Sequence, residues 1–181
     1  MKKIGIILTI AMLMVQCKKE NHFLIDKNKI GNLESTTQVY ELEALFASDS
    51  LVVRLGEGDF ADSSYDEYLV YSKKGEQLLS IIPKEQHDST ATIDHVQILN
   101  TKFKSEKGLG LASTFKDIVD MYSVSKVEDA ISVAQISIDE LNATVTIDKK
   151  ELGLNDFSSH KIVVEQIPDM AKIKTLTIWF E

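Results

Sequence analysis

Three sequence patterns occur twice along the chain in the same order, and this repetition constrains the fold more than any other feature. Each pattern is a helical or strand-like spacing of apolar residues, and the second copies follow the first after 76, 76 and 80 positions. The matching positions are Val39 and Phe115, Leu69 and Val145, and Ala91 and Ala171. Because the three matches keep their order, we predict a tandem duplication with units at residues 29–100 and 101–181.

A short helical pattern begins each unit, after a turn that glycine marks. Gly31 precedes the first pattern, and Gly108 and Gly110 precede the second. Thr114 and Asp117 have the spacing of a capping box, which satisfies the first free amides of a helix. Helices this short are not stable alone, so each one needs a sheet to pack on.

The rest of each unit is predicted to form strands, because short β-branched, aromatic or alternating runs are separated by turn residues. The expected strands cover residues 51–55, 67–71, 77–82, 92–99, 126–127, 131–138, 143–148 and 173–180. Short links between consecutive strands favour antiparallel pairing. We therefore predict an α+β fold of two tandem repeats, each with one or two short helices packed on a three- to four-stranded antiparallel sheet.

The beginning of the chain has the layout of an export signal. Lys2 and Lys3 form a basic start, and an apolar run follows over residues 4–15. This run is shorter than the roughly 20 residues that cross a bilayer as a helix, so a transmembrane anchor is not expected. Residues 1–16 are therefore predicted to be a signal peptide that the mature protein lacks.

The single cysteine of the chain, Cys17, directly follows this signal. Residues 13–17 resemble the lipobox of bacterial lipoproteins, in which diacylglycerol is attached to the cysteine. Gln16 departs from the small residue usual at its position, and the alternative is an ordinary secretory signal with an incidental cysteine. We predict lipidation at Cys17, with residues 17–28 as lipid anchor and tether. Lys18 favours the outer membrane over the inner membrane, by analogy with the sorting rule of enteric bacteria.

The charge of the mature chain argues against a nucleic-acid partner. Loss of Lys2 and Lys3 with the signal peptide changes the formal net charge from -8 to -10. An acidic chain is repelled by phosphate backbones. The content of 44% hydrophobic and 27% charged residues is typical of a globular protein rather than a disordered one.

A resemblance to known envelope proteins rests on residues 107–118, which read Lys-Gly-Leu-Gly-Leu-Ala-Ser-Thr-Phe-Lys-Asp-Ile. This combination of glycines, small residues and a helix start resembles uncharacterised Bacteroidota lipoproteins. It is also similar to the small lipoprotein subunit of the outer-membrane β-barrel assembly machine and to β-lactamase-inhibitor-like proteins. Those proteins bind other proteins and are not enzymes, so the resemblance implies a binding role.

No residue pattern indicates a reaction or a cofactor. Residues 108–113 nearly match the dinucleotide fingerprint G-x-G-x-x-G, but Ser113 replaces the third glycine and no βαβ unit surrounds the segment. The four histidines show no metal-ligand spacing, and no serine has a nucleophile-elbow pattern. We therefore expect a protein that is not an enzyme and has no cofactor.

One acidic run could ligate calcium. Asp59, Asp62 and Asp66 lie in the longest loop of the first unit, near Gly56 and Gly58. Their spacing is not that of an EF-hand loop, and the second unit has no counterpart. A solvated hairpin tip is therefore the favoured interpretation, and calcium binding is the weaker alternative.

The candidate partner surface comes from strand alternation. If Val96, Ile98, Leu176 and Ile178 face the helices, the neighbouring side chains face the other way. That opposite face would contain His95, Gln97, Leu99, Thr175, Thr177 and Trp179. Tryptophan is enriched at interface hot spots, so this face could bind a partner. The alternative is a solvated sheet face on which a loop or the other unit covers the tryptophan.

The sequence therefore predicts a non-enzymatic, lipid-anchored envelope lipoprotein that acts as a protein-binding or assembly module. Its expected partners are the membrane, through lipidated Cys17, and an envelope protein. The alternative function is a periplasmic small-ligand carrier or sensor that uses a cleft between helix and sheet or between the repeats.

Overall fold

The computed structural model describes residues 21–56, 65–155 and 162–181, and β-strands dominate this part of the chain. The larger sheet contains β4 (Ser50–Arg54), β5 (Glu67–Tyr71), β6 (Gln77–Pro83), β7 (Ile93–Ile98), β9 (Lys126–Asp129), β10 (Val133–Ile138), β11 (Ala143–Asp148) and β12 (Ile173–Trp179). The smaller sheet contains β1 (Leu24–Asp26), β2 (Lys29–Ile30), β3 (Leu33–Glu34) and β8 (Lys104–Ser105). The helices are α1 (Leu42–Leu45) and α2 (Phe115–Met121), with 3₁₀ turns η1 (Val39–Glu41), η2 (Lys149–Leu152) and η3 (Val164–Gln166).

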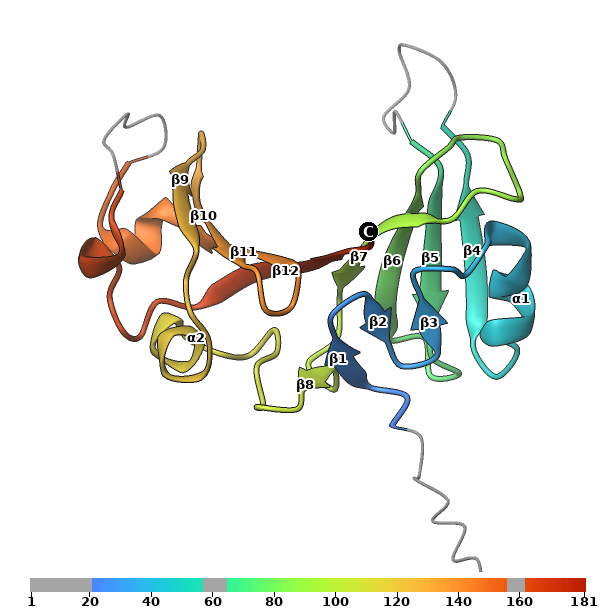
Figure 1. Ribbon diagram of the computed structural model, residues 1–181, viewed down its shortest axis with the longest axis horizontal. Coiled ribbons are helices and arrows are strands. Elements are labelled where there is room, and N and C mark those ends of the chain that lie inside the picture. Colours follow the sequence, from blue (N-terminus) through green and yellow to red (C-terminus); the bar gives the residue numbers. More distant parts are fainter. Residues whose placement is uncertain (1–20, 57–64, 156–161) are drawn as a thin grey trace, which may run out of the picture.

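The larger sheet is continuous and antiparallel, with the strand order β4-β5-β6-β7-β12-β11-β10-β9. Its central pair is β7 and β12, in which Val96 lies opposite Ile178 and Gln97 lies opposite Thr177. Figure 1 shows two arms of this sheet rising on either side of the central pair, one formed by β4, β5 and β6 and the other by β9 and β10. The central pair therefore joins the two halves of the chain.

The predicted α+β fold class was wrong. The described residues form twelve strands in two sheets and contain two α-helices of only four and seven residues. The two expected units, residues 29–100 and 101–181, do not form two separate helix-and-sheet repeats, because their last strands pair with each other. A sequence pattern reveals where strands are but not which strand edges meet, since pairing depends on the tertiary context.

The smaller sheet was not predicted. β1 pairs antiparallel with β2 and parallel with β8, which brings together segments about eighty residues apart in the chain. Ile25, Ile30 and Leu33 of this sheet are almost completely buried. β1 lies within residues 17–28, the stretch expected to be a tether, so the end of that stretch is part of the folded core.

In β7, β10, β11 and β12 the side chains of the larger sheet alternate between a buried face and an open face, whereas β6 is buried on both sides over most of its length. Val96, Ile98, Leu176 and Ile178 of the central pair are buried. They belong to one hydrophobic cluster that also receives side chains from the smaller sheet and from both helices. The core therefore lies on this face of the sheet, whereas the open face carries the alternate, mainly polar residues.

The predicted capping box at the start of α2 is confirmed. The Thr114 hydroxyl accepts a hydrogen bond from the Asp117 amide at 3.4 Å. The Asp117 carboxylate accepts one from the Thr114 amide at 2.8 Å. These bonds satisfy amides that have no partner inside a helix, and Phe115 and Ile118 then point into the core.

Candidate functional site

The open face of the larger sheet is the candidate functional surface, and its centre lies on the central pair. Trp179 lies opposite His95, and Thr177 lies opposite Gln97. These four positions alternate with the buried residues of the same strands, so all four side chains belong to the open face. The structure thus brings together residues that are about eighty positions apart in the sequence.

Trp179 is held in position by contacts on the open face. Its ring lies 4.6 Å from the His95 ring, measured between centroids, at an interplanar angle of 43°. The indole Nε1 donates a hydrogen bond to the Thr144 hydroxyl at 2.9 Å. Asp94 lies beside this pair, with a carboxylate oxygen 2.7 Å from Nδ1 of His95. Trp179 nevertheless keeps 38% of its surface exposed, so it is oriented without being part of the core.

Hydroxyl groups extend the open face toward β11. Thr144 lies opposite Thr177 and Thr146 opposite Thr175. The hydroxyls of Thr146 and Thr175 are 2.6 Å apart, so they hydrogen-bond across the strands. Beta-branched threonines suit a pleated strand and leave their hydroxyls available on its polar face. The result is a preorganised patch of neutral hydrogen-bonding groups beside the tryptophan.

Of the six residues predicted to form the partner surface, only Leu99 lies outside the strands of the central pair. It follows β7, is partly buried, and donates its amide to the Leu78 carbonyl at 3.0 Å. His95, Gln97, Thr175, Thr177 and Trp179 therefore share the predicted face on regular strands. Asp94 and Thr144 also contact these residues and were not predicted. Sequence alternation identifies which face a residue occupies but not its partner on another strand.

The calcium alternative involves Asp66, since Asp59 and Asp62 lie outside the described residues. Asp66 is only 1% exposed, and its carboxylate accepts the amides of Gly56 at 3.0 Å and His87 at 2.6 Å. Its oxygens therefore hold two chain segments together. Burial raises the pKa of the nearby Tyr68 hydroxyl, and the Asp66 charge raises it further.

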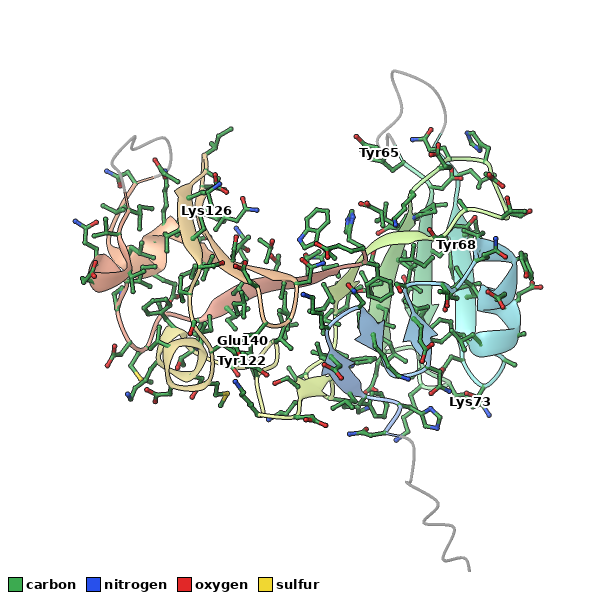
Figure 2. The ribbon with its side chains drawn as sticks, viewed as in Figure 1. Tyr65, Tyr68, Lys73, Tyr122, Lys126 and Glu140 are labelled. Carbon is green, nitrogen blue, oxygen red and sulfur yellow. The ribbon has the colours of Figure 1, made fainter. Side chains whose placement is uncertain are left out.

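Residues 107–118, on which the expected resemblance rests, make defined contacts with neighbouring parts of the structure. The Lys107 ammonium lies 2.8 Å from Glu140 and 4.2 Å from the ring centroid of Tyr122. Figure 2 shows Tyr122 and Glu140 close together beside α2. Two hydrogen bonds hold the pKa of Glu140 below its usual value. The larger effect comes from the Lys107 ammonium and the smaller one from the Ser123 amide. A β-carbon on Gly110 would lie 2.5 Å from the Phe103 carbonyl oxygen, so glycine permits a close backbone approach here.

The three histidines within the described residues lie at separate places in the fold. His22 lies at the edge of a pocket, His87 contacts Asp66, and His95 is on the open face. Throughout the described ranges, no group of three or more His, Cys, Asp or Glu side chains is arranged to hold a metal ion. His160 and Cys17 lie outside those ranges.

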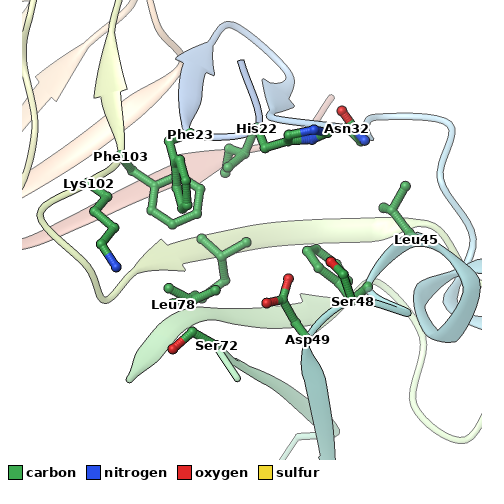
Figure 3. Close-up of a pocket in the computed structure, with 13 residues that line it drawn as sticks. His22, Phe23, Asn32, Leu45, Ser48, Asp49, Ser72, Leu78, Lys102 and Phe103 are labelled. Atoms are coloured by element: carbon green, nitrogen blue, oxygen red, sulfur yellow. The ribbon is translucent and has the colours of Figure 1, made fainter. Parts of the chain in front are cut away.

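A second candidate site is a pocket of about 270 Å³ between α1, β6 and the first described residues of the chain, which we call the α1 pocket. Figure 3 shows the side chains that line it. Its lining includes the apolar residues Phe23, Leu45, Leu78 and Phe103 and the charged residues Asp49 and Lys102. No sequence signal indicated this pocket, because its walls come from segments that only the fold brings together.

No helix in the part of the chain that the structure describes is long and apolar enough to cross a membrane. The predicted signal peptide and Cys17 precede that part, so the prediction of lipid anchoring stays a prediction.

Comparison with known proteins shows a shared fold. No protein-family model matches the sequence, and no curated protein matches it. Among solved structures, the chain is similar to the crystal structure of the uncharacterized protein yfeY from Escherichia coli, with a TM-score of 0.55 and 13% sequence identity. The match covers 86% of this chain and 99% of that one. At this identity the likeness concerns the fold alone.

Proposed function

We propose that the protein is a non-enzymatic, lipid-anchored envelope protein that binds another protein through the open face of its larger sheet. The supporting observation is the exposed Trp179 at the centre of a preorganised polar patch. Interface hot spots are enriched in tryptophan, and a side chain already held in place loses little conformational entropy on binding. The acidic chain makes nucleic acid a poor partner for the same surface.

A Trp179→Ala substitution tests this proposal. A photo-crosslinking amino acid at Gln97 should capture a defined envelope protein, and the same probe at Lys116 on α2 should not. In the Trp179→Ala background the crosslink from position 97 should disappear. The free energy of unfolding should fall by about 1–3 kcal/mol, because an aromatic contact and one hydrogen bond are lost from a partly exposed site.

The matched control is Val119→Ala, which removes an apolar side chain of similar exposure from α2. It should leave the crosslink unchanged. If the crosslink survives Trp179→Ala, the open face does not bind the partner through this residue. If the substitution unfolds the protein, Trp179 belongs to the core instead of the partner surface.

Lipid anchoring is tested at Cys17. We expect Cys17→Ser to abolish incorporation of a palmitate analogue and to release the protein from the membrane fraction, because serine cannot form the thioether to diacylglycerol. Gln16→Ser is the control, since it introduces a small residue before the cysteine and should label at least as strongly as the natural chain. Unchanged labelling of Cys17→Ser would refute anchoring at this residue.

The α1 pocket supports a second candidate function, the small-ligand carrier or sensor. Such a protein needs a cleft between helix and sheet, and the α1 pocket lies between α1 and β6. Its volume is just below the roughly 300–1,000 Å³ of most small-molecule sites, so its occupant would be small.

A further inference from the structure

Apolar side chains from four separate segments form most of the α1 pocket. Phe23 and Phe103 contact each other edge to face, with ring centroids 5.1 Å apart and an interplanar angle of 77°. Leu78 of β6 and Leu45 of α1 complete the apolar wall. Leu78 and Phe103 are buried, so this wall is anchored in the core. Removing a hydrophobic group from water against such a wall is favourable.

The charged side chains of the pocket are not balanced. Lys102 is paired, since its ammonium lies 2.6 Å from Glu76, which is outside the pocket lining. Asp49 is partly buried, and none of the described residues forms a hydrogen bond or ion pair with its carboxylate. Figure 3 shows the Asp49 carboxylate pointing toward Leu78. The pocket therefore contains one negative charge, that of Asp49, with no partner among the described residues.

An uncompensated carboxylate beside aromatic rings selects for cations. A carboxylate that has lost part of its hydration gains from a charge-assisted hydrogen bond with an ammonium group. Aromatic rings attract cations as well, through their negative faces. An anion would instead meet the unbalanced charge of Asp49.

We infer that the α1 pocket binds a small organic ammonium ion that carries a single hydrophobic ring or a branched alkyl group. The ammonium group donates hydrogen bonds to Asp49, and the hydrophobic group packs against Leu78, Phe23 and Phe103. This inference rests on the carrier function and is independent of protein binding at the open face. The pocket volume of about 270 Å³ limits the ligand to roughly the size of a substituted benzene.

The test is an NMR titration of the full chain with three probes of similar shape: 2-phenylethylamine, 2-phenylethanol and phenylacetate. We expect the amine to shift the amide signals of Asp49, Leu78 and Phe103 in a saturable way. The alcohol should bind about tenfold more weakly than the amine, because it lacks the charge-assisted bond. Phenylacetate should bind more weakly still.

Asp49→Asn should reduce the affinity for the amine to that for the alcohol, because asparagine keeps the shape of the side chain and removes its charge. Asp120→Asn is the matched control, since Asp120 is an exposed carboxylate on α2 that pairs with Lys116. It should leave amine binding unchanged. Ser48→Trp, at an exposed lining position, should block all three probes by filling the pocket.

The outcomes separate the ligand class from the carrier function. Equal binding of the amine and the alcohol, or retention of amine binding in Asp49→Asn, would refute the cation specificity while leaving a small-molecule site. Absence of saturable shifts with all three probes would refute both the cation specificity and the carrier function. Neither result bears on the open face, which the crosslinking experiment tests separately.

Discussion

Ile178→Ala is expected to lower the free energy of unfolding by about 2–5 kcal/mol, the range found for buried Ile truncations. Ile178 has 0% exposure and lies on the buried face of β12, opposite Val96 of β7 and Ala143 of β11. The substitution leaves a cavity at the pair of strands, β7 and β12, through which the larger sheet continues from one arm to the other. A close-packed core cannot collapse fully around such a cavity.

Urea unfolding followed by fluorescence measures this effect, because Trp179, the single tryptophan, is next to Ile178 on the same strand. Thr177→Ala is the control on the opposite face, and it should cost less than about 1 kcal/mol, within the span of strand propensities. Similar losses for the two variants would mean that the buried and open faces have been assigned wrongly.

Asp129→Ala is expected to lower the free energy of unfolding by roughly 2 kcal/mol, because it removes a partly exposed carboxylate that pairs with a buried ammonium group. The Lys149 ammonium lies 2.6 Å from Asp129, and the lysine side chain is only 1% exposed. A buried ammonium ion keeps its desolvation cost when this carboxylate is removed. This pair links η2 to the edge strand β9, so the loss should loosen that end of the sheet.

The neighbouring pair on the same strand is the matched control. Lys126 and Glu128 are 2.7 Å apart, but both side chains are about half exposed. Glu128→Ala should therefore change the free energy of unfolding by less than about 1 kcal/mol, as for most surface ion pairs. If thermal or urea unfolding shows equal losses of stability for Asp129→Ala and Glu128→Ala, the burial of Lys149 does not increase the contribution of its ion pair to stability.

Most individual strands could be predicted from local sequence. β5 and β11 coincide with the predicted residues 67–71 and 143–148. Their alternating apolar residues and flanking turns act over a few residues, which is the range that a sequence pattern reports. The same holds for the capping box of Thr114 and Asp117, since all its atoms belong to one helical turn.

The arrangement of those strands could not be predicted in the same way. The pairing of β7 with β12 and of β1 with β8 joins residues that are far apart in the chain. Two short helical patterns also suggested more helix than the structure contains, because a short helix gains little from its own hydrogen bonds. Only packing in the core determines where such segments begin and end.

For the candidate sites, too, the sequence predicted the face on which residues lie but not their contacts with distant segments. The sequence placed His95, Gln97, Thr175, Thr177 and Trp179 on one face, because side chains alternate along every strand. It could not place Trp179 against His95, and it contained no sign of the α1 pocket, where Phe23, Asp49 and Phe103 meet.

By itself, the sequence determined which segments form the strands of the larger sheet, which side chains of its central pair are apolar, and how α2 is capped, since these depend on interactions between near neighbours in the chain. The tertiary structure alone decided that eight strands form one sheet, that Ile25, Ile30 and Leu33 belong to the core, and that the Asp49 carboxylate, which has no partner among the described residues, lines an aromatic pocket. The physical reason is that strand pairing and pocket formation depend on backbone hydrogen bonds and packing between distant segments, and many pairings satisfy the same local pattern.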